Sequence, residues 1–195
     1  MPEFLSQPFL EIARRLDIRG PSPWLAVLVS PTDTTVGLED LQTELRSFLQ
    51  IPTRVLPLET STFQELREAL QQPTDDAVVL SAGADLAPEK WRSLDLMRSA
   101  LERTGPIILW MVSNAVAGLV EFAPNIRSFI GPSIFMAGPD GGIMTETERQ
   151  DRLIELEQHY GLTNEEILRR AESSELPLEP EFVEWLVLLG RGDLV

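Results

Sequence analysis

The chain has 195 residues, with 31 acidic against 16 basic side chains and a formal net charge of −15. This balance excludes a general binder of nucleic acids or anionic membranes, because contacts with phosphate need an excess of cations. There is no cysteine and a single histidine, His159, which excludes a disulfide framework, a thiolate zinc site and a multi-histidine metal site. The first residues lack a signal-peptide pattern and no apolar run reaches membrane length, so we expect a cytoplasmic protein.

Apolar segments typical of buried strands alternate with amphipathic segments typical of helices through residue 138. Strands are expected at Trp24–Val29, Arg54–Leu58, Ala77–Leu80, Ile107–Val112 and Ser133–Ala137. Helices are expected before the first strand and between the later ones: up to Gly20, over Leu38–Leu49, from a cap at Thr60 or Ser61 with Phe63, Leu66 and Leu70 buried, over Pro88–Leu101, and over Val116–Phe122 with Pro124 as its end. The pattern predicts an α/β fold, a doubly wound, mostly parallel sheet of about five strands with helices on both faces.

After Gly138–Gly142, the alternation of strand and helix patterns gives way to helical patterns alone. This glycine-rich segment is of the kind that separates domains. We therefore expect an α/β domain over residues 1–138 and a small C-terminal helical appendage over residues 144–195. Thr145 and Glu148 have the spacing of a capping box, Thr163 and Glu166 repeat it, and an apolar helix is expected at Phe182–Leu189. From Met144 onward there are 13 acidic and 5 basic residues, a net charge of −8.

The loop after the first strand is the first place to look for a ligand, because open α/β sheets bind ligands at the carboxyl ends of their strands. Ser30–Gly37 lacks the lysine and all but one glycine of a phosphate-cradling loop. Phosphate binding through Thr34, Thr35 and Gly37, with Ser113 after the fourth strand, is physically possible at the start of the following helix. The alternative is an ordinary polar loop that caps this helix.

Metal sites and catalytic residues have less support in the sequence than the possible phosphate site. Asp33, Glu59 and Asp85 follow strands, but their spacing matches no metal-binding motif, so we expect neither a metal nor a cofactor. The sequence has no serine in a nucleophile-elbow motif for which His159 would act as the base. The position of His159 at a helix end suits a structural role. No residue is predicted to be catalytic.

The stretch Ala77–Ile130 resembles the Walker B and sensor-1 region of bacterial STAND-type, AAA-related P-loop NTPases. The matching positions are Leu94, Asp95 and Arg98, then Trp110 and Ser113, then Ala123, Pro124, Asn125 and Ser128. The phosphate loop is absent, and Ser81 or Ala82 stands where the family has its Walker B acid. The resemblance therefore implies a related fold that has lost its catalytic apparatus, a pseudo-NTPase.

The C-terminal segment is similar to that of some bacterial type II antitoxins. The matching positions are Leu156, Glu157, Tyr160, Gly161, Thr163, Glu165, Glu166, Phe182, Glu184 and Trp185. On this basis Tyr160, Glu165, Glu166, Phe182, Glu184 and Trp185 are candidate contacts with a protein partner that has a basic surface. The alternative is that the aromatic residues of this segment pack on the chain's own sheet.

Three hypotheses for function follow. The first is a non-catalytic regulatory or protein-interaction module, a pseudo-NTPase component of a bacterial defence or toxin–antitoxin-like system, that binds its partner through the acidic, aromatic C-terminal helices. The second is a divergent nucleotide-binding or hydrolysing enzyme that uses the loop 32–37. The third is a structural module that associates with a second copy of itself. The sequence favours a role without catalysis but leaves the three open.

Overall fold

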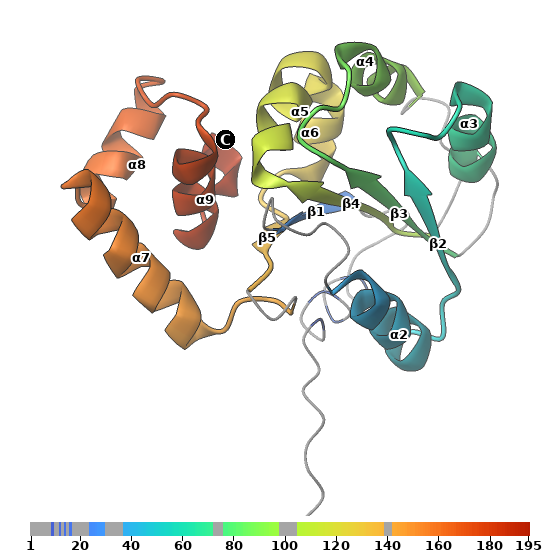
Figure 1. The fold of residues 1–195 in the computed structure, drawn as a ribbon, viewed down its shortest axis with the longest axis horizontal. Helices are drawn as coiled ribbons and strands as arrows, with labels where there is room; N and C mark the ends of the chain where they lie inside the picture. Colours follow the sequence, from blue (N-terminus) through green and yellow to red (C-terminus); the bar gives the residue numbers. More distant parts are fainter. Residues whose placement is uncertain are drawn as a thin grey trace, which may run out of the picture.

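The computed structural model describes Phe9, Ile12, Arg14, Leu16 and residues 24–29, 37–71, 76–97, 105–138 and 142–195. Its centre is a five-stranded sheet in the order β2-β3-β4-β1-β5, and every pair of neighbouring strands is parallel (Figure 1). The strands are β1 (Trp24–Val29), β2 (Thr53–Pro57), β3 (Ala77–Ala82), β4 (Ile107–Val112) and β5 (Ile134–Met136). The predicted doubly wound α/β fold is confirmed.

Helices lie on both faces of the sheet, as expected, and a further group follows the last strand (Figure 1). On one face lies α2 (Leu38–Phe48). On the other lie α3 (Phe63–Gln71), α4 (Pro88–Met97), α5 (Val116–Phe122) and α6 (Pro124–Ile130). The helices after the sheet are α7 (Glu146–Tyr160), α8 (Asn164–Glu172) and α9 (Pro180–Leu188), and short 3₁₀ turns, η2 (Ser113–Ala115) and η3 (Gly192–Leu194), follow β4 and α9.

The core is built around the two central strands. All six residues of β1 and all six of β4 are buried, as strands covered on both faces must be. Ile12 and Leu16 near the N-terminus are helical and buried, and the ring of Phe9 packs edge-on against Trp110 at 5.7 Å. The backbone N–H of Phe9 donates to Glu44 on α2 at 3.0 Å, which ties this segment to the sheet face that α2 covers.

Some helix boundaries differ from those the sequence predicts: α9 begins at Pro180, two residues before its expected start, and further differences occur at α3 and α6. Helix α3 is capped by Thr62, not by Thr60 or Ser61, because Thr62 and Glu65 exchange hydrogen bonds with each other's backbone and side chain. Phe63 is consequently at the start of the helix and 52% exposed, so its predicted burial is wrong. Pro124 ends α5 as expected, but it also begins α6, which the sequence reading missed; proline suits the first helical position, where no N–H is needed.

The glycine-rich segment after β5 brings the chain back beside the strand. Ala137 and Ile143 form an antiparallel bridge, and the N–H of Met144 donates to the carbonyl of Met136 at 3.1 Å. Residues 139–141 lie outside the described part. The helical group therefore begins directly alongside the edge strand β5.

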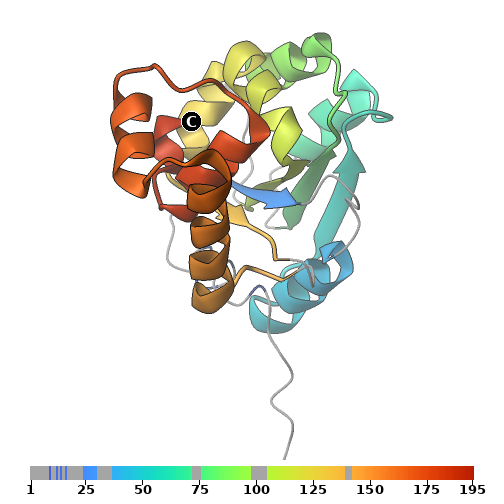
Figure 2. The same cartoon turned by 60° about the vertical axis from the view of Figure 1, so that its left-hand side comes forward.

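The three helices after the sheet form a unit, residues 144–195, which we call the C-terminal unit. Helix α9 lies between the sheet and the outer helices α7 and α8 (Figures 1 and 2), and it contacts β5 and η2 on one side and α7 and α8 on the other. Its apolar side chains Val183, Trp185, Leu186, Val187 and Leu188 are buried. Across the described residues, no helix has both the length and the apolar character that crossing a membrane requires.

Candidate functional site

The carboxyl ends of β1 and β4 form a topological switch point. The chain leaves β1 by way of α2 toward the edge strand β2, and it leaves β4 by way of α5 and α6 on the opposite face toward β5 (Figure 1). Connections that diverge in this way open a crevice at the sheet edge, which is where doubly wound sheets bind ligands. Val29 and Val112 are partners in register, so the carboxyl end of β1 lies beside the start of η2 at Ser113.

Only part of the predicted nucleotide site can be placed at this crevice. Ser113 is partly buried in η2, and Gly37 precedes α2 with a φ of +80°, a left-handed conformation that suits glycine. Thr34 and Thr35 lie outside the described residues. Helix α9 packs against η2, so the C-terminal unit borders the same end of β4.

Of the three carboxylates that follow strands in the sequence, Glu59 holds a loop in place, and Asp33 lies outside the described residues. Glu59 Oε1 accepts a hydrogen bond from the backbone N–H of Gly83, at the end of β3, where it closes the loop toward α4. Asp85 is exposed on that loop. Among the residues that the structure describes, no three acidic or histidine side chains gather as they would to hold a metal ion.

Asp95 has a structural role that the sequence reading did not recognise. Its buried carboxylate on α4 accepts hydrogen bonds from the backbone N–H groups of Asn125 and Ile126, at 3.0 and 2.9 Å, and from Asn125 Nδ2 at 2.7 Å. Helix α6 has Ala123 at its N-cap position and thus no capping side chain of its own, so Asp95 supplies the cap from a neighbouring helix. The Leu-Asp and Ala-Pro-Asn positions of the NTPase resemblance therefore contact each other. Arg98 lies outside the described residues.

One of the candidate partner contacts on α9, Trp185, is held inside the protein. It has no exposed surface, its Nε1 donates to Asn164 Oδ1 on α8 at 2.7 Å, and its ring lies 6.0 Å from that of Tyr160 on α7. Phe182 is partly buried, and its ring lies 5.1 Å from the same Tyr160 ring. Helix α9 also contacts β5 and η2 of the chain's own α/β part, but these two aromatic rings contact the outer helices.

The acidic candidates differ in how far they are already paired. Glu184 makes a two-pronged ion pair with Arg152, at 2.7 and 3.1 Å. Glu166 pairs with Arg169 and Arg170 on its own helix, and these hydrogen bonds lower its pKa to about 2. Glu165 is exposed, and within the described ranges it has no cation at ion-pair distance. Only Glu165 of these three is therefore free to meet a basic partner without breaking an existing pair.

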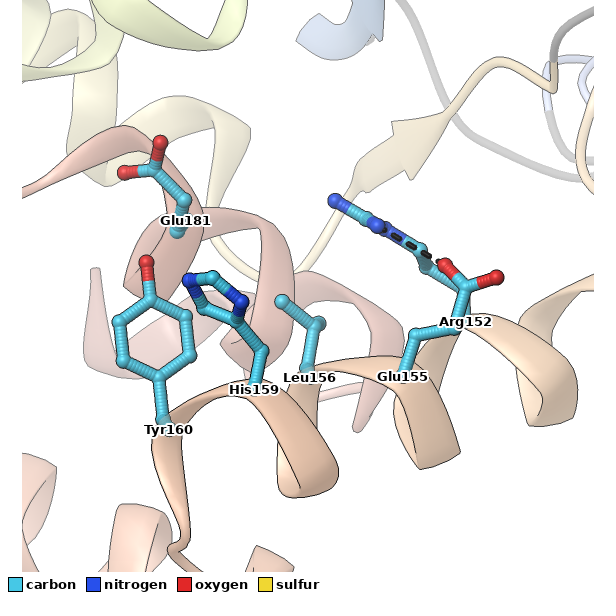
Figure 3. Close-up of a pocket in the computed structure, with 6 residues that line it drawn as sticks. All are labelled: Arg152, Glu155, Leu156, His159, Tyr160 and Glu181. Atoms are coloured by element: carbon cyan, nitrogen blue, oxygen red, sulfur yellow. Dashed lines mark hydrogen bonds and ion pairs between the residues drawn. The ribbon is translucent and has the colours of Figure 1, made fainter.

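A polar pocket lies on the outer surface between α7 and α9, and we call it the α7/α9 pocket. Its volume is about 330 Å³, and it is lined by Arg152, Glu155, Leu156, His159, Tyr160 and Glu181 (Figure 3). Figure 3 shows the His159 and Tyr160 rings side by side, with the Tyr160 hydroxyl beside Glu181; the two rings meet edge-on at 4.8 Å. Burial, and next the charges of Glu181 and Glu179, raise the pKa of Tyr160. Arg152 already pairs with Glu155 at 3.0 Å, so Glu181 is the lining carboxylate for which no ion pair is found among the described residues. One unpaired carboxylate beside an aromatic face favours a cationic group over an anion.

Arg127 fastens the end of the C-terminal unit to the α/β layers. From α6, its guanidinium donates to the carbonyls of Gly131 and Val195, each at 3.1 Å, and to that of Gly192. Burial lowers the pKa of Arg127, and the charge of Asp193 opposes that shift. The C-terminal unit is thus held by polar contacts of α6 as well as by the apolar face of α9.

The fold and these surfaces define the class: an α/β protein with a doubly wound parallel sheet, a switch point between β1 and β4, and a docked, acidic helical unit. No protein-family model matches the chain, and a search of curated proteins finds no match either.

Proposed function

We propose that the chain is a non-catalytic protein-interaction module, a pseudo-NTPase in its α/β part, which binds a partner with a basic surface through its C-terminal unit. The observation that carries the proposal is the distribution of free charge. Glu165, Glu179 and Glu181 are exposed and, within the described ranges, have no cation at ion-pair distance, while residues 144–195 hold −8 of the net −15. Complementary charge of this kind steers a partner and fixes its orientation.

The packing of α9 changes which residues are proposed to contact the partner. Trp185 is a core residue of the unit, so the partner meets the outer surface instead: the α7/α9 pocket with Tyr160 and Glu181, and Glu165 on α8. We propose that a lysine or arginine side chain of the partner enters the α7/α9 pocket. A cytoplasmic setting and a place in a bacterial defence or toxin–antitoxin-like system belong to the same proposal.

A charge-reversal pair of variants tests this proposal. One variant replaces Glu165, Glu179 and Glu181 by lysine; its matched control replaces Glu39, Asp40 and Glu68, exposed acids on α2 and α3, and so has the same net charge. Proteins captured by affinity-tagged chain are identified, purified and titrated against all three forms. We expect a basic partner whose binding is lost only with the first variant. Equal binding to both variants, or no purified partner that binds the unaltered chain, overturns the proposal.

A second candidate function, nucleotide binding at the loop 32–37, is favoured by the switch point. Val112 and Val29 are partners in register, so Ser113 follows β4 beside the carboxyl end of β1, and ligands of this class of sheet bind at such strand ends. Thermal unfolding in millimolar ATP, GTP and ADP is the test, because a ligand that binds the native state raises the unfolding temperature. An unchanged melting temperature in all three nucleotides removes this candidate. Light scattering that shows a clean monomer likewise removes self-association.

A further inference from the structure

An apolar groove lies where the C-terminal unit meets α5, and we call it the α5/α9 groove. Its volume is about 270 Å³, and its walls include Val120 on α5, Leu178 before α9, Phe182 and Leu186 on α9, and Leu194 near the C-terminus. Ligand pockets of drug size span about 300 to 1,000 Å³. The groove is therefore suited to one or two apolar side chains and not to a cofactor-sized molecule.

Three acidic side chains are chain neighbours of residues in the groove walls. Glu121 follows Val120, Glu179 follows Leu178, and Glu181 precedes Phe182; all three acids are exposed and, within the described ranges, have no cation at ion-pair distance. Of the nearby cations, Arg127 donates to the carbonyl of Val195 at 3.1 Å, and Arg191 is paired with Glu172 and Asp193, at 3.1 and 3.0 Å. An apolar groove with an acidic rim complements a segment that has an apolar side chain between basic ones.

The groove and the α7/α9 pocket are neighbours on the surface. The Phe182 ring, a wall of the groove, lies 5.1 Å from the Tyr160 ring, which lines the pocket. Glu181 lines the pocket and the next residue, Phe182, lines the groove. A single segment that crosses the start of α9 therefore reaches both.

We infer that the α5/α9 groove is the anchor site for a basic, amphipathic segment of a partner protein: a leucine-sized or phenylalanine-sized side chain fills the groove, and flanking lysines or arginines meet Glu121, Glu179 and Glu181. The inference rests on the proposed function, since it names how the basic partner is held. It adds a requirement that the proposed function lacks, because a purely electrostatic partner has no need of an apolar side chain.

The test uses a fluorescein-labelled peptide of about 14 residues, roughly four helical turns, built from leucine and lysine with leucine at i, i+3, i+4 and i+7. A second peptide has every leucine replaced by serine, so that its charge is unchanged. Fluorescence anisotropy of each peptide is measured against the full chain and its variants. We expect the leucine–lysine peptide to bind at least about tenfold more tightly than the serine peptide, since burial of one apolar side chain supplies that factor.

Two matched variants locate the site. Leu178→Asp places a charge in the groove, and Leu96→Asp places the same charge on α4; both leucines are exposed, at 44% and 74%, so both variants are expected to fold, which far-UV circular dichroism checks. We expect Leu178→Asp to weaken binding about tenfold or more, and Leu96→Asp to leave it within about twofold. The milder Leu178→Ser is expected to weaken binding several-fold, and it replaces Leu178→Asp if that variant misfolds.

The outcomes separate this inference from the proposed function. If the serine peptide binds as well as the leucine–lysine peptide, or if Leu178→Asp behaves like Leu96→Asp, the groove is not the anchor, while the acidic surface still binds cations. If the leucine–lysine peptide binds equally well after charge reversal at Glu165, Glu179 and Glu181, the acidic surface fails and both are overturned. Absence of any binding overturns the groove inference, and the capture experiment then decides the proposed function by itself.

Discussion

Strands β1 and β4 bury every one of their twelve residues, whereas helices α7 and α8 bury only Leu153, Leu156 and Ile167. The sheet is stabilised by apolar area removed from water on both of its faces. The outer helices are instead stabilised by polar contacts between residues that are close in sequence. These contacts are a capping box at Thr145, a cap at Thr163, and ion pairs between residues three or four positions apart. The sheet is thus held mainly by apolar burial, and the outer helices by polar contacts along each helix. Helix α9 joins the two regions, because it contacts β5 and η2 as well as α7 and α8.

The same contrast separates scaffold from recognition surface. Most of the sheet is covered by helices, so its side chains are committed to the core. The outer helices leave carboxylates at the surface, and residues 144–195 have a net charge of −8. The proposed partner of opposite charge would make its contacts on this second region.

The sharpest way to break the comparison is to remove Trp185 from α9, the helix that joins the two regions; the Trp185 side chain contacts Tyr160 on α7 and Asn164 on α8. Trp185→Ala leaves a cavity beneath α9, and loss of a buried tryptophan costs about 3 to 5 kcal/mol of unfolding free energy. We expect a large drop in the denaturant midpoint, with the C-terminal unit losing amide protection before β4 in hydrogen exchange. Trp185→Phe is the control, with a smaller loss. A variant as stable as the unaltered chain would show that α9 does not join the regions.

Removing the cap of α6 tests the α/β side of the same junction, since α6 also bears Arg127. Asp95→Ala leaves the N–H groups of Asn125 and Ile126 without their acceptor, and we expect a loss of about 1 to 3 kcal/mol in urea unfolding. Asp85→Ala, at an exposed position, is the matched control and should change stability by less than about 0.5 kcal/mol. Equal effects of the two variants would refute the capping role.

Within the C-terminal unit, the pair between Arg152 and Glu184 links α7 to α9. The side chains are 38% and 18% exposed, so solvent screens the pair and we expect a coupling of about 0.5 to 1 kcal/mol. A double-mutant cycle with Arg152→Met and Glu184→Gln measures it. The pair Arg191–Asp193, at 35% and 46% exposure, serves as the comparison and should couple more weakly; the reverse order would contradict this ranking.

Lowering the pH is expected to give the smallest effect among these tests of the contrast between the two regions. Hydrogen bonds from Arg149 and from Arg169 lower the pKa values of Glu146 and Glu166 to about 2, against 4.5 for an unperturbed glutamate. Their contribution is therefore fully present above pH 4.5 and is lost as the pH falls toward 2. In an NMR titration we expect both carboxyl groups to titrate near 2, and amides of α7 and α8 to lose protection at a higher pH than those of β4. Carboxyl pKa values near 4.5 for Glu146 and Glu166, or loss of amide protection at the same pH in both regions, would contradict this prediction.

The sequence by itself determined the class of fold and most of its elements. Short continuous apolar runs such as Ile107–Val112, bounded by turn residues, are typical of strands buried on both faces, and the intervening helical patterns favour parallel crossovers. The caps at Thr145 and Thr163 were equally readable, because capping depends on residues three positions apart in the chain. The acidic character of the C-terminal unit also followed from composition.

Contacts between distant residues were decided only by the tertiary structure. The strand order, the cap that Asp95 supplies to α6 from thirty residues away, and the burial of Trp185 between α9 and the outer helices depend on which elements become neighbours. Local patterns cannot encode these contacts, because the same amphipathic helix α9 satisfies its apolar face equally well on a partner or on its own sheet. Only the packed structure, in which β5 and η2 lie within reach of α9, selects between the two.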